Sequence, residues 1–412
     1  MEQEKLTALD LTLIVGCKLN CHYCPQNILI ENYFKDNPKR QRMLKFDDFK
    51  IILDKVERGS TIGFVGLAEV FLNPACADMI VYADKMGYKI SLYTTLVGMT
   101  MEDLEKIRGI QFDRLVLHIP DAEYNSKFDV TNEYVEILRR FHQYFPIDFY
   151  SCHGSVHPAI IDIIDKEKYS KLEPQNRAGN LDMEEFERFD WKGKISCYRV
   201  WSAAAWSVSF MPELLPDGTV LYCCQDYGLK HQLGNLINQS WKEICNGKEY
   251  KRVIDGFSDD TVDTLCRQCG CASPIDKLPT MQLKQAILKY KESIHKEKLN
   301  YHQQIVAELA TAETVCVFGL GKLFREHFYQ EYWDEALGVT IFSDNDVNWQ
   351  GQSIKGIPCV EPTSLTGYQN LVVILFIRND CNAITQQLKR IGVDHILRIE
   401  QVLDACNTLK GR

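Results

Sequence analysis

Three cysteines stand within eight residues near the start of the chain, in the stretch "GCKLNCHYCP" that covers residues 16–25. Cys17, Cys21 and Cys24 have C-x3-C-x2-C spacing, directly after an apolar run and before a proline. Three thiolates are one ligand fewer than a closed tetrahedral zinc site or a fully protein-ligated four-iron cluster requires. A metal centre held in this way keeps an open coordination position, which a substrate or cofactor can occupy.

This motif resembles the hallmark of the radical S-adenosylmethionine (radical SAM) superfamily, in which it follows the first barrel strand and an aromatic residue, here Tyr23, precedes the last cysteine. The resemblance implies that Cys17, Cys21 and Cys24 hold a [4Fe-4S] cluster whose fourth iron is chelated by the amino and carboxylate groups of S-adenosylmethionine. A one-electron reductant such as flavodoxin or ferredoxin then drives cleavage to methionine and a 5'-deoxyadenosyl radical. The alternative is a zinc site completed by His22 or by a distant ligand.

Two further segments match cofactor-binding positions of this family in part. "GLAEV" at 66–70 stands where the family has a Gly-Gly-Glu-Pro-like segment, and it keeps the carboxylate but neither the second glycine nor the proline. The resemblance implies that Glu69 accepts the cofactor's ammonium group, for which a negative acceptor is suitable. Thr94 and Thr95, after the third strand, would bond ribose hydroxyls. An exposed glutamate at a helix start and the ordinary β-propensity of threonine are the alternatives.

Three polar residues fall near the ends of later strands. His118, in "LHIP", ends the fourth expected strand, while His153 and Arg177 lie where the barrel would close. His118 and Arg177 are candidates for binding the cofactor. Arg177 could pair with the cofactor carboxylate or with an acidic substrate, since guanidinium groups recognise carboxylates well. A structural histidine and a surface ion pair are the alternatives.

The elements that must position these residues alternate from residue 9 to about 190. Apolar strand patterns are separated by amphipathic helical stretches, and they lie at 9–15, 61–67, 89–95, 114–120 and 147–154. This alternation predicts an α/β fold of parallel βα units. We expect a partial (β/α)6 barrel of the radical SAM type, which carries its chemistry on loops at the carboxyl ends of the strands.

A second group of six cysteines lies at positions 197, 223, 224, 266, 269 and 271. Its Gly218-x4-Cys223 hairpin, "CCQD" pair and terminal C-x2-C resemble the SPASM or twitch extension of radical SAM enzymes, which carries an auxiliary iron-sulfur cluster. Four thiolates would close one auxiliary [4Fe-4S] site. The expected ligands are Cys197, Cys223, Cys266 and Cys269. Cys224 and Cys271 are the spare thiols, and a structural zinc site with the same ligands is the alternative.

The last hundred residues form a third kind of segment. "VFGLGKLF" places Gly319 and Gly321 between a strand and a helix, and Asp344 ends the next strand, which makes a partial dinucleotide fingerprint. The position of the third glycine is Phe324. The segment resembles the Rossmann-like domain found beside enzymes that modify sugars and polysaccharides, so nucleotide or nucleotide-sugar binding is expected. A purely structural turn is the alternative.

The length and composition of the chain limit the number of domains and the kinds of partner that we expect. A chain of 412 residues is too long for one core, and we expect a barrel at 1–190, a cluster domain at 191–278, a helical linker at 279–311 and a Rossmann-like domain at 312–412. The excess of 56 acidic over 47 basic residues disfavours a nucleic-acid partner. The acidic start and short apolar runs predict neither a secretory signal nor a membrane segment, and 16 cysteines suit a cytoplasmic metal protein.

The leading hypothesis is therefore a radical SAM enzyme of oxidoreductase or isomerase type. It would abstract hydrogen from a small polar substrate, such as a sugar or nucleotide-sugar, with an auxiliary cluster taking an electron or anchoring the substrate. A peptide-modifying maturase is the alternative among enzymes. A non-catalytic metal-sensing protein is the alternative outside them.

Overall fold

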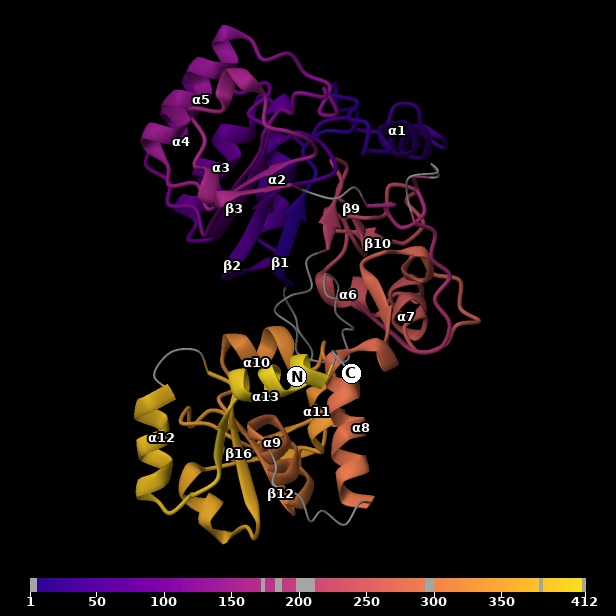
Figure 1. Cartoon of the computed structure of the whole chain (residues 1–412). Helices are drawn as coiled ribbons and strands as arrows, with labels where there is room; N and C mark the ends of the chain where they lie inside the picture. Colours follow the sequence, from indigo (N-terminus) through magenta and orange to yellow (C-terminus); the bar gives the residue numbers. More distant parts are fainter. Residues whose placement is uncertain are drawn as a thin grey trace. The chain divides into compact units, whose positions relative to one another are not determined.

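The computed structural model describes residues 6–171, 175–181, 187–197, 212–292, 300–377 and 381–409. The chain forms two compact units (Figure 1). The first spans Met1–Gly193 and Phe210–Ala272, and the second spans Lys194–Ser209 and Ser273–Arg412. Within the described ranges, no helix is both long enough and apolar enough to pass through a lipid bilayer.

The first unit is built on a sheet whose described strands follow the order β10-β9-β8-β1-β2-β3-β4-β5-β6. Strands β1 to β6 pair in parallel with their neighbours in sequence. They are β1 (Leu6–Leu11), β2 (Val56–Phe64), β3 (Lys89–Thr94), β4 (Arg114–His118), β5 (Phe149–Cys152) and β6 (Tyr169–Lys171). Such a sheet gathers the carboxyl ends of its strands, and the loops that follow them, at one edge. The predicted α/β class with parallel strands is confirmed, and the barrel stays a prediction.

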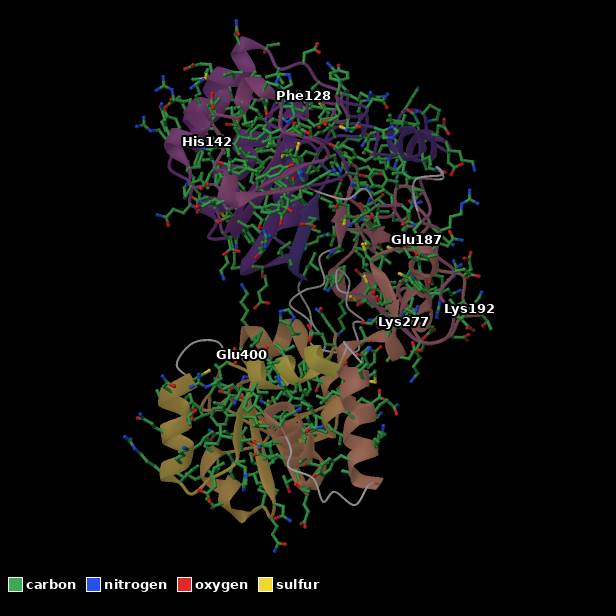
Figure 2. The ribbon with its side chains drawn as sticks, in the orientation of Figure 1. Phe128, His142, Glu187, Lys192, Lys277 and Glu400 are labelled. Atoms are coloured by element: carbon green, nitrogen blue, oxygen red, sulfur yellow. The ribbon has the colours of Figure 1, made fainter. Side chains whose placement is uncertain are left out.

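Helices connect these strands. They are α1 (Gln26–Phe34), α2 (Phe46–Leu53), α3 (Cys76–Lys85), α4 (Met101–Ile107) and α5 (Asn132–Tyr144). In α5 the buried residues are Tyr134, Ile137, Leu138 and Phe141, a spacing that places them on one helical face. His142, labelled in Figure 2, binds the Tyr150 hydroxyl of β5 through Nε2 at 2.8 Å and so joins helix to sheet.

The second cysteine-bearing segment extends the same sheet on the free side of β1. Strand β8 (Glu213–Leu214) runs parallel to β1, and β9 (Thr219–Leu221) and β10 (Gln232–Asn235) follow as an antiparallel hairpin. Gly218 occupies the turn before β9 with a φ of +84°, a conformation that favours glycine. Helices α6 (Trp241–Cys245) and α7 (Lys248–Asp255) and a 3-10 helix (Leu265–Gln268) complete the unit.

The second unit contains a six-stranded sheet in the order β14-β15-β13-β12-β16-β17. Its strands are β12 (Thr314–Phe318), β13 (Ile341–Ser343), β14 (Ser353–Ile354), β15 (Ile357–Val360), β16 (Leu371–Leu375) and β17 (Ile396–Arg398). All neighbours are parallel except β14 and β15. The strand order reverses beside β12, as it does in doubly wound sheets. That the second unit is a Rossmann-like domain stays a prediction. A two-stranded sheet of β7 (Ile195–Cys197) and β11 (Ala272–Pro274) is separate from it.

Helices cover both faces of this sheet because successive strand residues point to opposite sides. Val315 and Val317 of β12 join a core with the α8 and α9 residues of this unit, whereas Cys316 and Phe318 join another core with Leu388 of α12. The helices are α8 (Pro279–Glu292), α9 (Tyr301–Thr311), α10 (Lys322–His327), α11 (Trp333–Leu337), α12 (Cys381–Arg390) and α13 (Ile399–Leu409). The residues expected to form a linker therefore contribute, through α8 and α9, to the core of the second unit.

Candidate cluster and cofactor site

The loop with the three clustered cysteines runs from the end of β1 to the start of α1. Gly16 opens it with a φ of +102°, and a Cβ atom there would lie 2.8 Å from Arg42 Nη1. The backbone conformation therefore favours glycine at this position, whereas the flexible end of the Arg42 side chain could move aside for a Cβ atom. On the other side, the His22 backbone N–H donates to the Asn125 carbonyl at 3.0 Å, and Cys21 Sγ donates to the Ser126 carbonyl at 3.1 Å.

The turn that receives these bonds is itself held by one buried carboxylate. Asp121 accepts the backbone N–H groups of Asn125 at 2.8 Å and Ser126 at 2.9 Å, and the Ser126 hydroxyl at 2.8 Å. Burial acts to raise the pKa of Asp121, but these hydrogen bonds outweigh it and lower the pKa. The charged carboxylate of Asp121 thus holds in place the turn to which the cysteine loop is hydrogen-bonded.

The three thiols of the loop lie within electrostatic reach of one another. Burial, together with the charges of Cys24 and Cys17, raises the pKa of Cys21 to about 12. Burial also raises the pKa of Cys17, and the nearby backbone of Glu69 acts in the opposite direction. Binding of iron replaces the thiol proton, so a metal centre would relieve this unfavourable burial of charge.

Within the described part of the chain, no group of three or more His, Cys, Asp and Glu side chains is arranged to hold a metal ion. The three sulfurs therefore share one region without converging on a point. A [4Fe-4S] cluster presents separate irons to its thiolates, so its ligands surround a cage.

Glu69 contacts two residues, Thr94 and Thr95, that were predicted separately from it. Its side chain is 6% exposed. One carboxylate oxygen accepts the Thr94 hydroxyl at 2.6 Å and the Phe71 backbone N–H at 3.2 Å, and the other accepts the hydroxyl and backbone N–H of Thr95, both at 2.6 Å. Burial raises the pKa of Glu69, against these four bonds that lower it. All four acceptor positions of the carboxylate are occupied in this state.

A polar group of two histidines and an arginine lies beside the cysteine loop. His118 at the end of β4 hydrogen-bonds the Ser151 hydroxyl through Nδ1, and burial with the nearby Arg177 charge lowers its pKa to about 4. His153 stacks on the Tyr23 ring with centroids 3.4 Å apart, and burial followed by Arg177 lowers its pKa to about 4 as well. Both imidazoles are therefore neutral at pH 7.

Arg177 reaches the same loop from a strained backbone position. Its φ is +49°, and that of Ala178 is +53°, so two consecutive residues with side chains adopt the left-handed conformation. Arg177 Nε donates to the Tyr23 carbonyl at 3.5 Å, and its guanidinium lies 5.9 Å from the centre of the Tyr227 ring. Such strain is often kept at sites that bind ligands.

Three of the predicted auxiliary ligands lie in the first unit. Cys223, Cys266 and Cys269 are buried, and two of their sulfurs accept backbone N–H groups, Cys223 from Gln225 at 3.5 Å and Cys269 from Cys271 at 3.3 Å. Such bonds stabilise thiolates.

The remaining cysteines of this group differ from those three. Cys197 ends β7 in the second unit. Cys224 is half-buried and lies beside the Gln225 amide at 3.9 Å, whereas Cys271 donates to Gln175 Oε1 at 3.7 Å. The assignment of Cys224 and Cys271 as spare thiols stays a prediction.

The glycine turn of the second unit is closed by its own carboxylate. Gly319 has a φ of +97°, while a Cβ atom at Gly321 would meet open space. Asp344 accepts the Leu320 backbone N–H at 2.5 Å and the Asp346 backbone N–H at 2.8 Å. The structure thus brings the three predicted residues to one turn, and nucleotide binding there stays a prediction.

Sequence reasoning missed several residues that hold the site together. Gln26 bonds both ends of the cysteine loop, Thr12 binds the segment before Glu69, and the Tyr227 hydroxyl lies 3.6 Å from Cys24 Sγ. The only signals in the sequence are that Gln26 comes two residues after Cys24 and that Tyr227 directly follows "CCQD".

Comparison with known proteins bears on the second cysteine group. Residues 208–270 match the SPASM family model, an iron-sulfur cluster-binding domain, and this range contains Cys223, Cys224, Cys266 and Cys269. No curated protein is similar enough in sequence to count as a relative.

Several solved structures resemble the chain weakly. BtrN in complex with AdoMet and 2-DOIA is 17% identical over 66% of this chain and 94% of that chain, with a TM-score of 0.39. Streptococcus suis SuiB bound to precursor peptide SuiA is 13% identical over 65% and 70%, with a TM-score of 0.40. anSMEcpe with bound AdoMet and Cp18Cys peptide is 14% identical over 65% and 86%, with a TM-score of 0.38. TM-scores of this size do not establish a common fold.

The match to the SPASM model confirms the resemblance that the second cysteine group predicted. This domain follows, in the same chain, the C-x3-C-x2-C motif of Cys17, Cys21 and Cys24 on the loop after the first parallel strand. The chain therefore combines a match to an iron-sulfur cluster-binding domain with a three-cysteine motif that resembles the hallmark of the radical SAM superfamily.

Proposed function

We propose that this protein is a radical SAM enzyme that removes a hydrogen atom from a small polar substrate of the sugar or nucleotide-sugar class, leading to dehydrogenation, epimerisation or rearrangement. One observation carries the proposal: the Gln26 side chain binds both the Cys17 backbone N–H of the cysteine loop and the carbonyl oxygen of Leu67, two residues before Glu69. The metal-binding loop and the proposed acceptor of the cofactor's ammonium therefore meet. The methionine part of S-adenosylmethionine, which would chelate an iron, needs the cysteine loop and the acceptor of its ammonium group on the same side of the site.

The residues of the first unit divide the work of holding the cofactors. Cys17, Cys21 and Cys24 hold the cluster, and the Tyr23 ring packs beside them on His153. When bound, the reduced cluster and S-adenosylmethionine supply methionine and the 5'-deoxyadenosyl radical that abstracts the hydrogen atom. The protein's own task is to orient these groups and to exclude water.

Glu69, Thr94 and Thr95 form the proposed ammonium and ribose site. Because Glu69 already accepts four donors, an incoming ammonium takes the place of one of them. The Thr95 hydroxyl is the donor best suited to leave, since it can rotate away while its backbone N–H keeps the carboxylate in position. The freed hydroxyl is then available to a ribose oxygen.

Arg177, His118 and His153 supply the polar wall of the proposed substrate site. The guanidinium is suited to a carboxylate or phosphate group of the cofactor or substrate. The imidazoles, neutral at pH 7, each offer one donor and one acceptor for hydroxyl groups. His153 Nδ1 is buried without a hydrogen-bond partner among the described residues. A wall of this chemistry favours a substrate rich in hydroxyl groups.

The auxiliary cluster and the C-terminal unit complete the proposal. Cys197, Cys223, Cys266 and Cys269 would hold the auxiliary [4Fe-4S] cluster, which accepts an electron from the substrate radical or anchors the substrate. Gly319, Gly321 and Asp344 would form a nucleotide or nucleotide-sugar site within the second unit. Flavodoxin or ferredoxin is the proposed reductant.

The test is formation of 5'-deoxyadenosine under anaerobic reduction, followed by chromatography. We expect the wild type to form it and Cys24→Ala to form none, and normal turnover by Cys24→Ala would contradict the proposal. Panels of deuterated sugars, nucleotide-sugars and short peptides then test the substrate class. Deuterium in 5'-deoxyadenosine from a sugar supports the proposal, whereas deuterium from a peptide overturns the substrate class in favour of a maturase.

A further inference from the structure

Gln26 is a buried amide at the first position of α1, two residues after Cys24. Its side chain is 3% exposed, and it bonds three parts of the site. Its Oε1 accepts the Cys17 backbone N–H at 3.3 Å. Its Nε2 donates to Cys24 Sγ at 3.4 Å and to the Leu67 carbonyl oxygen. One side chain therefore spans the first and last cysteine of the motif.

The orientation of this amide follows from the chemistry of its partners. A backbone N–H needs an acceptor and a backbone carbonyl needs a donor, so only one assignment of oxygen and nitrogen satisfies Cys17 and Leu67 together. Burying an amide without such partners is unfavourable. The contacts therefore compensate for the burial of a polar residue where the helix would otherwise pack an apolar one.

The Leu67 peptide is held from its other side as well. Its N–H donates to Thr12 Oγ1 at 2.7 Å, and the Thr12 hydroxyl donates to Glu213 of β8 at 2.5 Å. Gly66 precedes it with a φ of +50°, where a Cβ atom would lie 2.6 Å from the Leu11 carbonyl oxygen. Leu67 is thus fixed two residues before Glu69, and Gln26 connects that fixed point to the cysteine loop.

We propose that Gln26 is a positioning residue for the cluster of Cys17, Cys21 and Cys24, an inference that rests on the proposed function. Its amide closes the loop and fixes it to the Glu69 segment. Its N–H directed at Cys24 Sγ stabilises the additional negative charge of the reduced cluster, because hydrogen bonds to the sulfurs help to set the reduction potential. Gln26 therefore makes the cluster easier to reduce.

The test compares Gln26→Met with Asn27→Met in the full-length, cluster-loaded protein. Methionine matches glutamine in length but has no amide, and Asn27 is the exposed neighbour in the same helical turn. Iron and sulfide content and redox titrations followed by electron paramagnetic resonance are the readouts. The signal of the first cluster is identified as the one that changes when S-adenosylmethionine is added. We expect its midpoint potential to fall in Gln26→Met, with the other signal unchanged and Asn27→Met like the wild type.

A second variant separates the hydrogen bond from loop closure. Gln26→Glu keeps an oxygen for the Cys17 N–H but has no N–H for Cys24, so its potential should fall as well. Loss of about half of the iron in Gln26→Met alone, with wild-type circular dichroism, supports the positioning role. Full iron content with unchanged potentials in both Gln26 variants overturns the inference alone. A wild type without any signal that responds to S-adenosylmethionine overturns the proposed function and this inference together.

Discussion

The Tyr227 hydroxyl lies 3.6 Å from Cys24 Sγ, so a residue of the SPASM domain touches the last cysteine of a motif 203 positions earlier in the chain. The tyrosine is 4% exposed and packs in a core with Val15, Leu29 and Leu215. The two cysteine-bearing segments therefore share a core within the first unit. A substitution in one segment should therefore affect the stability of the other.

Substitution of Tyr227 tests this shared core. Tyr227→Ala removes a buried ring and should lower the free energy of unfolding of the first unit by about 3–5 kcal/mol. Tyr227→Phe keeps the ring, and it should cost about 1 kcal/mol for the lost hydroxyl contact. Urea denaturation of the cluster-loaded proteins measures both. An alanine variant as stable as the phenylalanine variant would show that the ring does not tie the segments together.

The four bonds on Glu69 predict the effect of removing its charge. In Glu69→Gln the side-chain amide group faces donors rather than acceptors, so we expect a loss of about 1–3 kcal/mol in stability. Without the negative charge, S-adenosylmethionine should also bind at least about tenfold more weakly, which corresponds to about 1.4 kcal/mol. Equilibrium binding to the anaerobic protein measures this affinity, with the exposed Glu102→Gln as control. Equal affinities for Glu69→Gln and wild type would remove Glu69 from the ammonium site.

Much of this arrangement could be predicted from the sequence, because it depends on local patterns. Cysteine spacing identifies the cluster loop, and alternating strands and helices place Glu69, Thr94 and His118 at one edge of a parallel sheet. The hydrogen bonds between Glu69 and the two threonines could not be predicted, since they join side chains 25 and 26 residues apart.

Gln26, Thr12 and Tyr227 escaped prediction for a related reason. A glutamine at a helix start, a threonine after a strand and a tyrosine in a loop are ordinary in their local context. Their roles depend on partners 41, 55 and 203 residues away, which only the tertiary packing brings into contact. The helices at 279–311 were predicted, but their contribution to the core of the second unit was not. An amphipathic pattern shows which helical face is buried but not which element it packs against.

The two neutral histidines predict a dependence of stability on pH. In the folded state the pKa of His118 is about 4, whereas in the unfolded chain it is near 6.5. Between these values the unfolded state binds more protons than the folded state. The contribution of His118 to the free energy of unfolding is therefore fully present above pH 6.5 and is lost as the pH falls toward 4. His118 alone should account for about 1–2 kcal/mol between pH 6.5 and 4.5.

His118→Gln tests this dependence in urea denaturation at several pH values. The variant should lose stability less steeply than the wild type over the same range, and the remaining slope should include that of His153, whose pKa is also about 4. Identical slopes for variant and wild type would mean that His118 is charged or exposed in the folded protein.

Cys266 and Cys271, near the end of the second cysteine group, provide a matched pair of variants. Cys266→Ala removes a proposed ligand and should cost the auxiliary cluster, which is about half of the iron. Cys271→Ala removes a thiol that donates to Gln175 and should keep all of it. Iron and sulfide analysis after anaerobic purification measures both. Loss of iron in Cys271→Ala with full iron in Cys266→Ala would exchange the two assignments.

The most direct test of the central claim is the anaerobic iron and sulfide content of the wild type and of the Cys17→Ala, Cys21→Ala, Cys24→Ala triple variant. With one four-iron cluster in each cysteine group, roughly eight irons in the wild type should fall to roughly four in the variant. Equal iron contents in the two proteins would contradict the claim, because the three cysteines would then hold no cluster.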